Sequence, residues 1–148
     1  MYKHILIATD GSELANKGVE QGLALAEQLH AQVTVLSVVE PLETRVAQAA
    51  ILGGIEDPIA RYDQRVDEDM KKRFAAIERK AAEHGVSIEL FHEVDHSPAE
   101  AIVRAAKLRE CDLIVMSSHG RRGFRKLLLG SQTAEVLVHT TTPVLVIR

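Results

Sequence analysis

Short apolar segments alternate with longer amphipathic ones along the whole chain. Five segments rich in Ile, Leu and Val predict strands: "HILIAT" (residues 4–9), "QVTVLSVV" (32–39), "SIELFHEV" (87–94), "DLIVMSS" (112–118) and "PVLVIR" (143–148). All but the third are nearly uninterrupted apolar runs, which is the pattern of strands covered on both faces. In the third segment polar residues interrupt the apolar ones, which predicts an edge strand.

The stretches between these segments carry the three- and four-residue apolar spacing of helices. Four helices are predicted, at residues 14–29, 58–84, 98–108 and 131–139. The third of them opens on "SPAE", where Ser97 suits the N-cap, Pro98 the first helical position, and Glu100 completes a capping box. Strands and helices that alternate in this way predict one α/β domain, a doubly wound five-stranded parallel sheet with four helices, over residues 1–148.

One connection is longer than the tight turns of such a fold. Residues 40–57 contain Pro41, Gly53 and Gly54 and are expected to form a loop. Long loops of this kind tend to be functional or mobile. We find no internal repeat and no linker that would divide the chain.

Charge and cysteine content narrow the class of protein. The 18 Lys and Arg against 21 Asp and Glu give a net charge of −3, which argues against general nucleic-acid binding. The single cysteine, Cys111, excludes an internal disulfide and fits a reducing compartment. The opening "MYKHILIATDGS" resembles neither a signal peptide nor a membrane span. We therefore expect a cytoplasmic protein that is not associated with a membrane.

In open parallel sheets, ligands bind beyond the carboxyl ends of the strands, where the strand order reverses. The residues after the first four predicted strands are "TDGS" (9–12), "VVEP" (38–41), "DHSP" (95–98) and "SSHGRRG" (117–123). This collection is polar, small and glycine-bearing. It predicts a ligand site at that edge of the sheet.

Two glycines and a serine in the fourth of these loops suit a phosphate. Gly120 would let the backbone approach a phosphate closely, and "GS" at Gly130 and Ser131 opens a helix whose N–H groups favour anions. The alternative is a plain turn in which Ser131 is the N-cap. Asp10 has two interpretations as well: an acceptor for a ribose or a metal-bound phosphate, or a turn residue in "DGS".

Other reactive residues give weaker signals. The cations Arg121, Arg122, Arg125 and Lys126 are more typical of a solvated face than of a nucleic-acid site, since aromatic residues are only 3% of the chain. His119 lies in the glycine loop without an evident nucleophile beside it. His92 and His96 lack further metal ligands, and Cys111, which has no partner histidine, suits a small buried residue.

The ordered set of motifs resembles the universal stress protein family. The matching stretches are "YKHILIATDGSELA", "TVLSVVEP", "SPAEAIVRAAKLRECDLIVMSSHGRRG" and "LLLGSQTAEVLVHTTTPVLVIR". Together they cover nearly the whole chain, and the resemblance is weakest through residues 40–85. It implies an α/β fold with a five-stranded parallel sheet, and a homodimer that pairs through the C-terminal strand "PVLVIR".

The resemblance also implies a ligand, because one branch of the family binds ATP through a G-x2-G-x9-G-[S/T] pattern. Gly120, nine further residues and then Gly130–Ser131 match the second part of it, whereas Ser117 stands where the first glycine would be. Carried over by position, the expected ligand is ATP with Mg²⁺, held by Thr9, Asp10, Val38 or Val39, Met116, Ser117, Gly120, Gly130 and Ser131.

Three functions stay open at this point. The first is an ATP-binding stress protein whose nucleotide alters its conformation or its choice of protein partner. The second, favoured by Ser117, is a dimeric interaction protein without a nucleotide. The third is a slow ATP hydrolase, although the loop from Gly120 to Ser131 contains no carboxylate to activate water.

Overall fold

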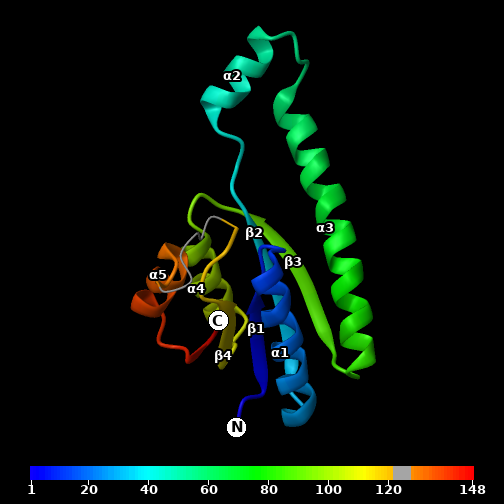
Figure 1. The fold of residues 1–148 in the computed structure, drawn as a ribbon, viewed down its shortest axis with the longest axis vertical. Coiled ribbons are helices and arrows are strands. Elements are labelled where there is room, and N and C mark those ends of the chain that lie inside the picture. The colour runs from blue at the N-terminus through cyan, green and yellow to red at the C-terminus, as the bar shows by residue number, and fades with distance from the viewer. Residues whose placement is uncertain (122–127) are drawn as a thin grey trace.

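The computed structural model describes residues 1–121 and 128–148. Its core is one parallel five-stranded sheet in the order β3-β2-β1-β4-β5 (Figure 1). The strands are β1 (His4–Ala8), β2 (Gln32–Val39), β3 (Ile88–Val94), β4 (Leu113–Ser117) and β5 (Val144–Ile147). The order reverses between β1 and β4, so the crevice that opens there is the expected place for a ligand.

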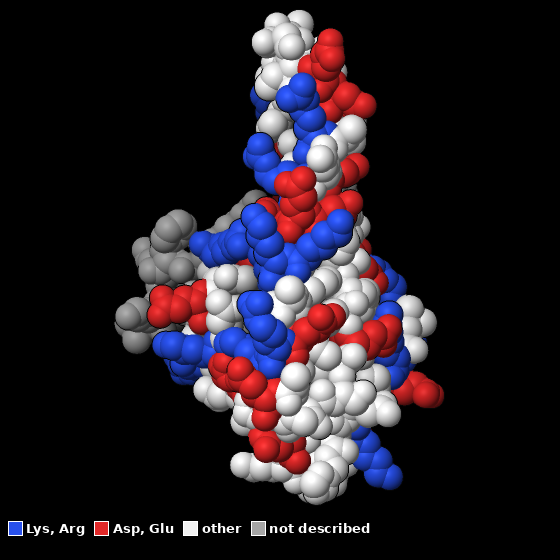
Figure 2. Space-filling model, turned by 90° about the vertical axis from the view of Figure 1, so that its right-hand side faces the viewer, with Lys and Arg blue, Asp and Glu red and all other residues white. Residues whose placement is uncertain are grey.

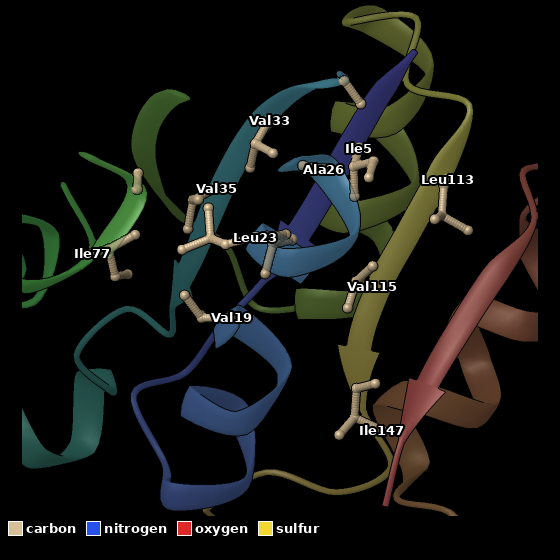
Figure 3. Close-up of a cluster of buried hydrophobic side chains, with 13 residues drawn as sticks. Ile5, Val19, Leu23, Ala26, Val33, Val35, Ile77, Leu113, Val115 and Ile147 are labelled. Atoms are coloured by element: carbon tan, nitrogen blue, oxygen red, sulfur yellow. The ribbon is translucent and has the colours of Figure 1, made fainter. Parts of the chain in front are cut away.

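Helices cover both faces of the sheet, as the doubly wound prediction requires. Helices α1 (Glu13–Leu29) and α3 (Pro58–Glu83) cover one face, and α4 (Pro98–Leu108) and α5 (Ser131–His139) cover the other (Figure 1). Alternate residues of each strand enter the two layers of core. In Figure 3, Ile5 of β1 and Val115 of β4 point toward Leu23 of α1, whereas Leu6 and Met116 belong to the opposite core.

Local chemistry sets where several helices begin and end. The Ser12 hydroxyl accepts a hydrogen bond from the Ala15 amide at the start of α1, and the Ser97 hydroxyl accepts one from the Glu100 amide at the start of α4. The Ser97 amide donates its hydrogen bond to the Asp95 carboxylate, and not to the Glu100 side chain. The predicted capping box is therefore formed only in its first half.

The helix count in the sequence-based prediction is wrong: the described chain contains five helices, not four. The additional helix, α2 (Thr44–Leu52), lies inside the segment predicted as a loop. It packs with the N-terminal part of α3, and together they form an arm that projects beyond the sheet (Figure 1). The stretch contains apolar residues at helical spacing, Val46, Ala49 and Ala50 among them, but Pro41, Gly53 and Gly54 beside it favoured a loop. Only Ala47 of α2 is buried.

The two edge strands of the sheet are β3 and β5. The interrupted pattern of residues 87–94 correctly predicts an edge strand, β3. Residues 143–148, predicted as a strand, contain β5, which is the other edge, and the Leu145 side chain is 38% exposed. No helix in the described ranges 1–121 and 128–148 is long and apolar enough to cross a membrane.

Two glycines one helical turn apart in α1 should respond oppositely to alanine. A Cβ on Gly22 would lie 2.5 Å from Cδ1 of Ile7, whose side chain is fully buried. A Cβ on Gly18 would meet only Ile147, at an ordinary 3.8 Å. We expect Gly22→Ala to lower the free energy of unfolding by about 1–2 kcal/mol through overpacking. Gly18→Ala should raise it by about 0.5–1 kcal/mol through lower backbone entropy in the unfolded chain.

Urea unfolding of the two variants beside the natural protein measures both values. An increase in both variants would show that helix propensity, and not the close approach of α1 to β1, governs these positions, and a decrease in both would contradict the free space beside Gly18.

Candidate functional site

A cavity of about 340 Å³ opens at the carboxyl ends of the strands, beside the point where the strand order reverses. Its volume lies at the lower end of the range of small-molecule sites. Eight of the nine residues selected from the sequence line it: Thr9, Asp10, Val38, Met116, Ser117, Gly120, Gly130 and Ser131. Val39, the ninth, does not, because the alternation of β2 turns consecutive side chains to opposite faces of the sheet.

One end of the cavity is apolar. Leu36 and Val38 come from β2, Met116 from β4, and Ile102 from α4, with Pro98 at the start of that helix. Leu36, Ile102 and Met116 are at least 94% buried within the core of this face. This end therefore offers an apolar surface that suits the ring of a ligand.

The carboxylate of Asp10 connects two loops at the polar end. Its Oδ1 accepts a hydrogen bond from the Ser12 amide at 2.9 Å, and its Oδ2 accepts one from the Arg121 amide at 2.8 Å. Burial raises the pKa of the Asp10 carboxyl, but the hydroxyl and amide of Ser12, the amide of Arg121 and the charge of Arg121 outweigh it, so the pKa lies below its ordinary value. Asp10 is thus an ionised group that joins the turn after β1 to the glycine loop after β4.

Close contacts leave little room for a side chain at either glycine of the loop after β4. A Cβ on Gly120 would overlap Oδ2 of Asp10. A Cβ on Gly130 would lie 3.1 Å from the Ser118 carbonyl oxygen, which accepts a 2.7 Å hydrogen bond from the Gly130 amide. The buried Thr133 hydroxyl adds hydrogen bonds to the carbonyls of Ser117 and Ser118. The start of α5 is therefore fixed against the end of β4.

The N-terminus of α5 differs from those of the other helices at this edge. The first turns of α1 and α4 are capped by serine hydroxyls, and the Ala99 amide of α4 also donates to Oε1 of Gln132. The N-cap of α5 is Gly130, and no side chain caps it; Ser131 is the first helical residue, so its predicted alternative role as N-cap is wrong. Among residues 1–121 and 128–148, no side chain caps the first amides of α5, and these amides suit an anion at the cavity wall.

The side chain of Ser117 lies away from the cavity. Along β4, Leu113 and Val115 belong to the core under α1, and Met116 belongs to the opposite core. Alternation then puts the Ser117 side chain on the α1 face, so that its backbone is the part that borders the cavity. A serine in place of glycine at this position consequently leaves the cavity open.

Comparison with known proteins agrees with this architecture. The whole chain, residues 1–148, matches the universal stress protein family. The chain belongs to this family. It is 31% identical to universal stress protein YxiE of Bacillus subtilis (strain 168), over 100% of both chains.

Solved structures show the same fold. The structure of MJ0577 from Methanocaldococcus jannaschii superimposes with a TM-score of 0.81 at 28% identity, over 99% of this chain and 96% of that one. A universal stress protein solved in complex with cAMP superimposes with a TM-score of 0.69 at 21% identity, over 99% of this chain and 98% of that one. At that identity the likeness extends to the fold alone.

In this universal stress protein, several further residues selected from the sequence have clear positions. His119 lines the cavity and its Nδ1 lies 3.2 Å from the Ser118 hydroxyl. Arg121 lines it too, whereas Arg122, Arg125 and Lys126 lie outside the described residues. Burial raises the pKa of the Cys111 thiol to about 11, which fits the buried, unreactive residue that the sequence predicts.

The described residues offer no metal site. Within residues 1–121 and 128–148, no group of three or more His, Cys, Asp or Glu side chains is placed to hold a metal ion.

Three residues that line the cavity were not selected from the sequence: Ile102, Gln132 and Thr133. Gln132 and Thr133 directly follow "GS", and Ile102 lies on the apolar stripe of α4. The sequence contains these features, but it does not show that the three side chains face the same cavity.

Proposed function

We propose that this universal stress protein binds an adenine nucleotide, ATP with Mg²⁺, and acts as a nucleotide-responsive regulatory or protective protein in the stress response. The observation that carries the proposal is the division of one cavity into two chemically different ends. The apolar end formed by β2, β4 and α4 suits a base, and the uncapped start of α5 suits phosphates. A nucleotide has the same division.

The described residues have definite roles in this proposal. Val38, Ile102 and Met116 would enclose the base, and the free lone pairs of the Asp10 carboxylate would accept a ribose hydroxyl. The amides at the start of α5, from Ser131 onward, would hold phosphate oxygens, with Mg²⁺ balancing their charge. A universal stress protein of the same fold has been solved in complex with cAMP, and that ligand belongs to the class proposed here.

Hydrolysis is the less favoured activity. Residues 119–130 contain no carboxylate, and both oxygens of Asp10 already accept backbone hydrogen bonds while its lowered pKa makes it a weak base. The alternative, an interaction protein without a nucleotide, rested on Ser117. The alternation of side chains along β4 turns the Ser117 side chain away from the cavity. Binding without rapid turnover is the function that the geometry supports best.

Calorimetric titration with ATP and Mg²⁺ tests binding against a matched pair of glycine variants. Gly120→Ala would displace the Asp10 carboxylate and should weaken ATP binding by about tenfold or more, the equivalent of one charge-assisted hydrogen bond. Gly53→Ala, at the end of α2 in the arm, adds a Cβ in ordinary contact and should leave the affinity unchanged.

Thermal unfolding gives a second readout of the same claim. ATP at a hundredfold excess over its dissociation constant should stabilise the natural protein by about 2.7 kcal/mol. No heat and no stabilisation at millimolar ATP would contradict nucleotide binding, and equal loss in both glycine variants would contradict the assigned position.

We further propose that the protein is a homodimer paired through β5. This strand is an edge of the sheet, so its outer backbone groups are open to a second strand. The exposed side chains of Leu145 on β5 and of Leu137 and Val138 at the end of α5 give the same edge an apolar surface. A second copy would cover both.

Sedimentation velocity tests this pairing. The natural protein should sediment with the mass of a dimer, and Leu145→Glu should shift it toward the monomer because two like charges would face each other across the two-fold axis. Leu108→Glu introduces the same charge at a leucine that is 75% exposed and lies at the end of α4. This control should stay dimeric; a dimer that survives both substitutions would contradict pairing through β5.

A further inference from the structure

A second groove lies on the other face of the sheet, between α1 and α3. It has a volume of about 470 Å³ and opens beside Gly11 in the turn after β1. Among residues 1–121 and 128–148, its lining has four cationic side chains, Lys72, Arg73, Lys80 and Arg121, and one carboxylate, that of Asp69. Figure 2 shows lysine and arginine side chains gathered on the side of the molecule where the arm joins the body.

Arg73 is the central cation of this groove. Its guanidinium lies against the backbone of Gly11, where a Cβ would come within 2.5 Å of Nη2. Within the described chain, its hydrogen bonds run from Nη1 to the Ser37 hydroxyl at 2.7 Å and to the Met70 sulfur at 3.8 Å. Arg73 is therefore half-buried and held in place, yet its hydrogen bonds go to neutral groups.

The charges around Arg73 favour an anion in the groove. Burial and the charge of Arg121 lower the pKa of the Arg73 guanidinium, an effect that Asp10 and Asp69 offset only in part. Two guanidinium groups that repel each other across a cavity are stabilised by an anion between them. Lys80, which also lines the groove, forms an ion pair with Glu20. Lys72 is therefore the third cation of the groove, beside the guanidinium groups of Arg73 and Arg121.

Side chains, not backbone amides, would recognise this anion. The Ser12 amide donates to Asp10, and the Ala15 amide donates to the Ser12 hydroxyl, so the start of α1 is already capped. Arginine and lysine side chains that converge on one space are typical partners of phosphate oxygens, with guanidinium groups able to bind two oxygens at once.

We propose that the groove between α1 and α3 binds a phosphate-bearing anion through Lys72, Arg73 and Arg121. Arg121 also lines the first cavity, and its amide donates to Asp10 there. The two sites are therefore neighbours through one residue, on opposite faces of the sheet. The phosphate can belong either to the tail of the nucleotide proposed above or to a separate phosphorylated molecule.

Titration of ¹⁵N-labelled protein with inorganic pyrophosphate at constant ionic strength tests the groove directly. We expect chemical-shift changes at the amides of Gly11, Asn16 and residues 69–80. Lys72→Gln should weaken pyrophosphate binding by about fivefold, the range of one exposed charge-assisted contact. Lys71→Gln removes the same charge from the next residue of α3, outside the groove, and should change the affinity less than twofold.

Two outcomes would overturn the proposal: shift changes confined to the start of α5, or equal weakening by Lys72→Gln and Lys71→Gln. Saturating AMP and ATP then distinguish the sources of phosphate. Displacement of pyrophosphate by ATP but not by AMP assigns the groove to the nucleotide tail, and retention with both assigns it to a separate ligand. Because pyrophosphate needs no nucleoside cavity, this titration decides the groove even if ATP fails to bind.

Discussion

The carboxylate of Asp10 is the interaction on which the rest of the site depends. It joins the turn after β1 to the loop after β4 through hydrogen bonds from the Ser12 and Arg121 amides. These two loops leave the sheet at the point where its strand order reverses, so without a link they would diverge to opposite faces. Gly120 lacks a Cβ at the place where Asp10 needs the space. One charged group therefore shapes the nucleotide cavity on one face and positions Arg121 beside the basic groove on the other.

Much of the fold follows from sequence pattern because a doubly wound sheet buries its strands on both sides. The predicted bounds of residues 32–39, 98–108 and 131–139 agree with β2, α4 and α5 to the residue. The arm was not predicted, because Pro41, Gly53 and Gly54 around α2 favoured a loop, and only Ala47 of this helix is buried. The apolar pattern of residues 143–148 does not by itself distinguish an edge strand from a central one, and the strand order shows that β5 is an edge.

The candidate site was predictable in its composition but not in its geometry. The glycine pattern located the start of α5, yet only the structure shows that Gly130 leaves that helix without a side-chain cap while α1 and α4 have one. The orientation of Ser117 likewise depends on strand register, which turns its side chain toward α1. The basic groove has no sequence motif at all, because Arg73 and Arg121 come from distant segments that meet only after folding.

The stability of Asp10→Asn as a function of pH tests the central role of this carboxylate most directly. The asparagine side chain has an NH₂ donor in place of one carboxylate oxygen, so one of the two backbone N–H groups, of Ser12 or Arg121, loses its acceptor. Urea unfolding at pH 7 should therefore show a free energy of unfolding lower by about 1–3 kcal/mol. The folded pKa of Asp10 lies below the unfolded value. Its contribution is therefore complete above the unfolded pKa of about 3.9 and lost as the pH falls through the folded pKa. We expect the difference in stability between the two proteins to be constant near neutral pH and to shrink in acid. Equal stabilities at pH 7, or a difference that does not change with pH, would contradict it.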